Sequence, residues 1–218
     1  MNSTPTFVAL YDGTTPQRPH ESPPDASGAD RTAEATQRRL ASTLNDISER
    51  LDVGSLVQLF VPKLQSRPGG ALVMLQTFKA FTRVKTVHQE KFWKYHRLSE
   101  GFFFNLSPGG DSNLLGLPGR CFLHSRAEWT PSVCCYQPTE YPRLGCAIEC
   151  QMHSTIALPV YFDDPRVRPA LPFAVMELLL DQQVTDMGRV FSICVGALRE
   201  NGLYTAGTDR LGTEDTMR

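Results

Sequence analysis

The sequence predicts an α+β domain: a central, mainly antiparallel sheet with the N- and C-terminal helices packed on one of its faces. Three features of the 218-residue chain lead to this prediction. Amphipathic segments lie near both ends, short β-prone runs lie between them, and turn-forming residues separate these runs. Strands that are grouped between terminal helices, rather than alternating with helices, are typical of the α+β class.

Two amphipathic helices are expected, over residues 36–51 and 184–201. Each has one apolar stripe at helical spacing, formed by Leu40, Leu44, Ile47 and Leu51 in the first and by Met187, Val190, Phe191, Cys194 and Leu198 in the second. Neither helix could stay folded alone in water, so we expect them to lie side by side on one face of the sheet. If part of either stripe stays exposed, a homodimer through these helices is expected.

The strands are expected in two pairs. LVQLFVPKL at 56–64 and ALVMLQ at 71–76 flank SRPGG, which favours a turn, so they are expected to form a hairpin. STIALPVYF at 154–162 and PFAVMELLL at 172–180 are expected as central antiparallel strands. Between the pairs we expect a helical turn over 92–99, a buried strand at GFFFNLS and mixed helical character at TEYPRLGCAIECQM.

Length and composition favour a single domain. Residues 1–34 are expected to be a disordered leader, 35–203 the folded domain and 204–218 a flexible tail. The formal net charge of −1 gives no basic field, so neither nucleic acid nor membrane is expected as a direct partner. We find no run approaching the roughly 20 apolar residues of a membrane span and no secretory signal. We therefore expect a cytosolic or nuclear protein whose six cysteines are reduced.

The cysteines are expected to be mostly buried thiols rather than ligands of a zinc ion. They include a CC pair and a CxxxC pair, but no CxxC or HxxxH completes a tetrahedral set with ordinary spacing. No nucleophile beside a base, GxSxG string or Walker loop is present, so we expect no enzyme, no metal and no cofactor. A redox reaction on this scaffold would need Cys121 or Cys146.

GLPGRCFLHSRAEWTP at 116–131 concentrates the residues that favour a binding site. LPGR is expected to be a tight turn before a helix starting at CFLH, which would place Arg120 in a first helical turn, where an anion is favoured. The alternative is that Arg120 pairs with a carboxylate such as Glu128. Trp129 would wall a pocket or fill the core, and His153 would donate to an anion or lie at an exposed strand edge.

Four motifs, in order, resemble the N-terminal conserved domain of the plant and green-algal NIN-like proteins, members of the RWP-RK transcription-factor group. They are LPGRCF, EWTPSVCCY, EYPRL and STIALPVYF, where the family has runs like LPGRVF, PEWTPNVQYY, EFSRLDHA and GTLALPVF. FAVMELLL is similar to the family's VGVLELI strand. The resemblance covers roughly residues 36–202 and implies a GAF-like sensor domain that binds nitrate or another small anion. The ligand-binding residues it suggests are Arg120, Trp129, Tyr136, Arg143, Cys146 and His153.

The resemblance also implies a place in a larger architecture. In the family, this domain regulates a downstream RWP-RK domain that binds DNA and a PB1 interaction domain, and the protein acts in the nucleus, with possible shuttling to the cytoplasm. Neither an RWPxRK string nor a PB1-like region occurs in these 218 residues, so DNA contact is expected from a domain outside them. The family's His falls on Cys146, whose neutral thiol is a poorer anion partner. The alternative function is an interaction module with an unoccupied pocket, which pairs with a second copy or another family chain.

Overall fold

The structure of this chain is a computed structural model that describes residues 26–64, 72–81, 89–106, 115–163 and 169–206. The first 25 residues of the expected leader, the SRPGG link and most of the expected tail lie outside these described residues. None of the described helices is long and apolar enough to cross a membrane.

One antiparallel sheet forms the centre of the fold. Its order is β3-β2-β1-β6-β5-β4, with β7 paired to β5. The bounds are β1 Ser55–Leu64, β2 Leu72–Phe81, β3 Phe104–Asn105, β4 Glu128–Thr130, β5 Ser154–Phe162, β6 Ala174–Leu180 and β7 Leu203–Tyr204. The β1–β2 pair confirms the predicted hairpin, and the adjacent β5 and β6 confirm the second predicted pair.

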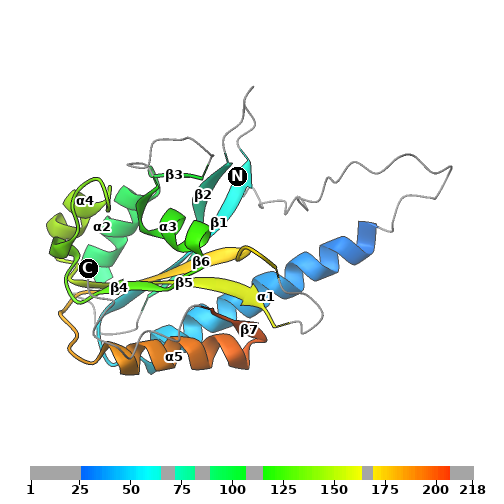
Figure 1. Cartoon of the computed structure of the whole chain (residues 1–218). Helices are drawn as coiled ribbons and strands as arrows, with labels where there is room; N and C mark the ends of the chain where they lie inside the picture. The colour runs from blue at the N-terminus through cyan, green and yellow to red at the C-terminus, as the bar shows by residue number, and fades with distance from the viewer. Residues whose placement is uncertain (1–25, 65–71, 82–88, 107–114, 164–168, 207–218) are drawn as a thin grey trace.

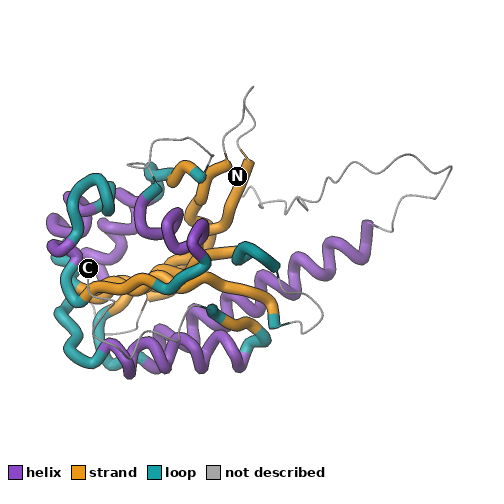
Figure 2. The backbone as a smooth tube through the Cα atoms, viewed as in Figure 1, coloured by secondary structure: helices purple, strands orange, loops and turns teal. Residues whose placement is uncertain are grey.

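Both terminal helices lie on one face of this sheet, as predicted (Figures 1 and 2). They are α1, Ala26–Arg50, and α5, Met187–Glu200. Their apolar stripes form one buried cluster with alternate residues of β1, β5 and β6. Polar contacts also join the two helices, for Asn201 Nδ2 donates to Asp46 Oδ2 at 2.8 Å. Eight of the nine predicted stripe residues are buried and Phe191 of α5 is partly exposed beside the cluster, so the homodimer through these helices stays a prediction.

The first helix begins at Ala26, earlier than the predicted start near Ala35. Its N-terminal half extends past the sheet, as Figure 1 shows. The first residues of α1 therefore lie away from the sheet and need no apolar stripe. For this reason the apolar period predicted only the C-terminal half of the helix.

The opposite face carries the irregular middle of the chain (Figure 2). Its helices are α2 Gln89–Ser99, α3 Gly116–His124 and α4 Leu144–Glu149, with a 3-10 turn at Val133–Cys135. The predicted helical turn at 92–99 is thus a longer helix. The prediction of a strand at GFFFNLS was largely wrong: only Phe104 and Asn105 pair with β2, and Phe103 is exposed. In this aromatic run Phe104 packs into the core, but the run does not form a longer strand.

The prediction that LPGR is a tight turn before the helix was also wrong. Helix α3 begins at Gly116 and includes LPGR, so Arg120 lies in its second turn. Pro118 is tolerated there because N–H groups of the first turn have no helical acceptor. Gly116 has φ +55, and a Cβ on it would lie 2.5 Å from the Phe104 ring. The sharp change of chain direction before the helix is therefore at Gly116, where only glycine fits without strain.

Candidate functional site

The structure does not bring the six predicted residues into one pocket. Arg120, Tyr136, Arg143 and Cys146 lie on the face that carries α2, α3 and α4. Trp129 packs against the cluster on the opposite face, because it pairs with Ile156 on β5 and side chains alternate along a strand. His153 is exposed just before β5, and its backbone bonds Leu180 and Val133.

Arg120 is held by a carboxylate, which confirms the alternative prediction for this residue. Its Nε donates to Glu128 Oε2 at 3.1 Å and its Nη2 donates to Glu128 Oε1 at 2.5 Å. Its Nη1 donates to the carbonyl of Glu140, and the guanidinium lies 5.6 Å from the centroid of the Tyr136 ring. This bidentate pair joins α3 to the edge strand β4.

Arg143, at the start of α4, is a fully buried charged residue of this face, with an exposed fraction of 0%. Its Nη2 donates to Glu177 Oε1, on the central strand β6, at 2.6 Å. The guanidinium carbon lies 5.0 to 5.8 Å from four ring centroids, those of Phe60, Tyr95, Phe104 and Tyr141. Burial opposes the charge, but Glu177 and the two tyrosines outweigh it and raise the pKa of Arg143, so the guanidinium stays protonated.

Further polar groups surround the Glu177 carboxylate. Gln58, directly opposite on β1, donates from Nε2 to Glu177 Oε2 at 3.3 Å. The hydroxyl of Tyr141 donates to Glu177 Oε1 at 3.4 Å and lies 2.7 Å from the hydroxyl of Tyr95. Burial raises the pKa of both tyrosines, so both are neutral. We use the name Arg143 chamber for these five side chains as a group: Gln58, Tyr95, Tyr141, Arg143 and Glu177.

The chamber contains hydrogen-bonding capacity that the described protein does not use. Nε and Nη1 of Arg143 and Oε1 of Gln58 are buried and have no partner among the described residues. Buried N–H groups of this kind are rarely left unbonded in folded proteins, because desolvation without a bond costs about 1 to 3 kcal/mol. The chamber therefore has two N–H donors for a bound acceptor.

Gln58 and Glu177 were missed at the level of sequence. Both interrupt apolar strands, in LVQLFV and VMELLL, and both are fully buried in the structure. A charged or amide side chain inside a run that predicts a central strand is itself a signal, since such groups are seldom buried without a partner. That signal would have pointed to a cation such as Arg143.

The cysteines divide between core and surface. Cys121, Cys150 and Cys194 are buried, Cys146 is partly buried, and Cys134 and Cys135 are exposed, so the prediction that most are buried holds for half of them. Burial, with a smaller effect of Glu149, raises the pKa of Cys146, which keeps this thiol neutral. Among the described residues, no three His, Cys, Asp or Glu side chains gather where they could hold a metal ion.

Several curated plant proteins are similar in sequence to this chain. Protein NLP3 of Oryza sativa subsp. japonica is 33% identical over 159 residues, which are 72% of this chain and 16% of that protein. Protein NLP3 of Arabidopsis thaliana is 30% identical over 174 residues, 79% of this chain and 22% of that protein. Protein NLP1 of Oryza sativa subsp. japonica is 31% identical over 169 residues, 77% of this chain and 17% of that protein.

The matched region is a small part of these relatives, because the chain spans only 16% to 22% of their length. No family model matches the chain. The matches nevertheless cover 72% to 79% of this chain. This chain therefore carries a domain of the NIN-like protein family.

Proposed function

We propose that this domain is a regulatory, ligand-sensing domain of a NIN-like transcription regulator and that it binds a small anion such as nitrate in the Arg143 chamber. The observation that carries the proposal is the fully buried guanidinium of Arg143, of which Nε and Nη1 donate to no described residue. N–H donors of a charged guanidinium favour anionic oxygens as acceptors. No enzymatic step is proposed.

The charge of the chamber limits which anion is suitable. Arg143 and Glu177 form a pair with no net charge, so a bound anion gains hydrogen bonds but adds a negative charge to a buried site. A singly charged ion with its charge spread over several oxygens loses the least on leaving water. Nitrate meets this condition, whereas phosphate is more strongly hydrated and larger.

The chamber is well placed to influence the helix-bearing face. Gln58 and Glu177 lie on the two central strands, β1 and β6. Their neighbours in sequence, including Leu59 and Met176, point to the other face and pack in the cluster that contains α1 and α5. A ligand that shifts either strand would therefore act directly on the packing of the two helices.

The wider context follows from the family. We propose that the regulated DNA contact is made by another part of the regulator, in the nucleus, and not by this domain. The expected partners are a small anion and a second copy or another family chain.

A second function, a protein-interaction module, is favoured by two observations. Aromatic side chains already fill much of the face that carries the chamber, and α1 extends past the sheet, where another chain could pack on it (Figure 1). Light scattering at two concentrations separates the functions, since a module of this kind should dimerise without any ligand. A monomer at both concentrations would argue against it.

The sensor proposal is tested by calorimetric titration of the purified chain with nitrate, with chloride and phosphate as controls. We expect saturable heat with nitrate and at least tenfold weaker binding of the other two ions. A titration with no saturable nitrate signal would contradict the proposal.

A further inference from the structure

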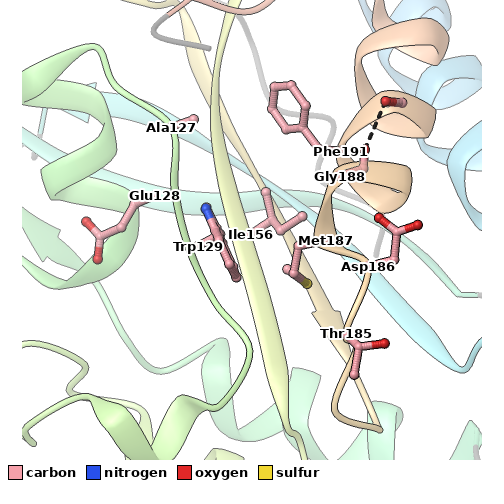
Figure 3. Close-up of a pocket in the computed structure, with 10 residues that line it drawn as sticks. Ala127, Glu128, Trp129, Ile156, Thr185, Asp186, Met187, Gly188 and Phe191 are labelled. Carbon is pink, nitrogen blue, oxygen red and sulfur yellow. Dashed lines mark hydrogen bonds between the residues drawn. The ribbon is translucent and has the colours of Figure 1, made fainter. Parts of the chain in front are cut away.

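A pocket of about 410 Å³ lies on the opposite face of the sheet, between the edge strand β4 and the start of α5. Figure 3 shows Trp129 and Ile156 from the strands on one side and Met187 and Phe191 from the helix on the other. The pocket is separate from the Arg143 chamber, because none of its lining residues belongs to the chamber.

Strand alternation places the aromatic wall. Trp129 pairs with Ile156, so both side chains point to the helix-bearing face. Glu128, the residue before Trp129 on β4, points to the other face. Trp129 is only partly buried and packs against the same apolar cluster as Phe191. The pocket is therefore an accessible edge of the apolar core.

Three of the polar side chains at the pocket are already hydrogen-bonded. The Glu128 carboxylate bonds Arg120 and is turned away from Trp129 (Figure 3). The Asp186 side chain accepts from the backbone N–H of Arg189 and caps α5. The hydroxyl of Ser192 donates to the Gly188 carbonyl. None of the ten lining residues is Lys, Arg or His.

We propose that this pocket binds a small uncharged aromatic molecule. Its volume is within the range of small-molecule sites, about 300 to 1,000 Å³, and such sites are mostly apolar with few polar groups. The Trp129 and Phe191 rings offer edge or offset stacking, and the Met187 sulfur makes favourable contacts with a ring. An anionic ligand would lie beside the Glu128 and Asp186 carboxylates with no Lys, Arg or His in the lining to offset its charge. A cationic ligand would meet carboxylates that are already engaged, Glu128 by Arg120 and Asp186 by the N-terminus of α5.

A ligand in this pocket would add a direct contact between the strand edge and α5. One wall of the pocket belongs to β4 and β5, and the other belongs to α5. Helix α5 is in turn joined to α1 by the Asn201–Asp46 hydrogen bond, and to the residues that follow α1 by the Arg189–Asp52 ion pair. Occupancy would thus hold the edge strand against the helix layer. The domain would then respond to a second ligand at a site distinct from that of the proposed anion.

The test is ¹H–¹⁵N NMR of the intact chain, because its two tryptophans give two indole N–H signals. The variant Trp93→Phe assigns the signal of Trp129. Indole and phenol are the uncharged probes, and benzoate and benzylamine are the charged ones. We expect indole and phenol to shift the Trp129 signal saturably and the charged probes to bind at least tenfold more weakly. No saturable shift, or equal binding of the charged probes, would overturn the proposal.

A blocking variant gives the second readout. A Cβ at Gly188 would contact only Asp186 Oδ1, at 3.4 Å, so Gly188→Leu adds volume at the pocket without a backbone clash. We expect it to weaken indole binding at least tenfold, whereas Gly145→Leu, at a position with nothing within 4 Å of a new Cβ, leaves binding unchanged. If Gly188→Leu does not fold, Phe191→Ala replaces it with the same expected loss. Unchanged binding in the folded blocking variant would overturn the proposal.

Discussion

Arg143 at the start of α4 donates to Glu177 on β6 across 2.6 Å, and both side chains are completely buried. The bond joins two sequence motifs that are far apart in the chain, EYPRL and FAVMELLL. Arg120 and Glu128 join LPGRCF to EWTP in the same manner. The motifs that identify the family are therefore held together by two ion pairs, one buried and one near the surface.

Removing one partner of the buried pair should destabilise the domain strongly. Arg143→Met leaves Glu177 buried without a counter-charge, and such changes cost about 3 to 5 kcal/mol. The double variant Arg143→Met/Glu177→Leu removes both charges and should recover most of this loss. Urea denaturation of both variants is the measurement. A double variant no more stable than the single one would show that the pair does not act as a unit.

Arg120→Ala should lower stability without lowering anion affinity. The change leaves Glu128 unpaired at a partly buried site, which we expect to cost about 1 to 2 kcal/mol, and each kcal/mol lowers the melting temperature by about 2 to 4 °C. Arg126→Ala, at an exposed arginine of the same segment, is the matched control and should have little effect. A stable Arg120→Ala variant with weakened nitrate binding would move the anion site from Arg143 to Arg120.

Gly116→Ala should be among the most damaging small substitutions. The residue has φ +55, and its new Cβ would lie 2.5 Å from the Phe104 ring. The left-handed conformation costs about 1 to 2 kcal/mol and the overpacking about 1 to 3 kcal/mol more. Gly145→Ala in α4, where no atom lies within 4 Å of a new Cβ, is the control and should not be destabilising. Equal melting temperatures of the two variants would contradict this description of the α3 start.

Stability should fall at alkaline pH partly through Cys194. Burial raises the pKa of this thiol from 9.0 to about 12. Below pH 9 the thiol is protonated in both the folded and the unfolded chain; between pH 9 and 12 only the unfolded chain loses the proton, so the free energy of unfolding decreases as pH rises. The single-site slope approaches about 1.4 kcal/mol per pH unit. Cys194→Ala should reduce the slope between pH 9 and 10.5, and an unchanged slope would exclude this thiol as the cause.

The sequence predicted secondary structure best where a long segment kept one apolar pattern. The stripes of α1 and α5 predicted their shared face because each helix has one way to bury its leucines and valines. STIALPVYF matched β5 at both ends, since a buried strand is a continuous apolar run bounded by polar residues.

The site was less predictable because it depends on contacts between distant residues. Arg143 was expected among the ligand donors, but its partner Glu177 is 34 positions away and only the sheet brings the two together. Trp129 and Glu128 are neighbours in sequence, yet strand alternation sends them to opposite faces. A list of residues close together in sequence therefore could not predict which face of the sheet each side chain reaches.

The most direct test of the proposed sensor is nitrate calorimetry on the intact chain and on Glu177→Gln, with melting temperatures measured at several nitrate concentrations. The amide keeps an acceptor for Arg143 but removes the negative charge next to the proposed anion. We predict that nitrate binds Glu177→Gln about tenfold more tightly or better, and that nitrate raises its melting temperature more than that of the unchanged chain. Equal affinities, or no nitrate binding to either protein, would contradict binding of the anion in the Arg143 chamber.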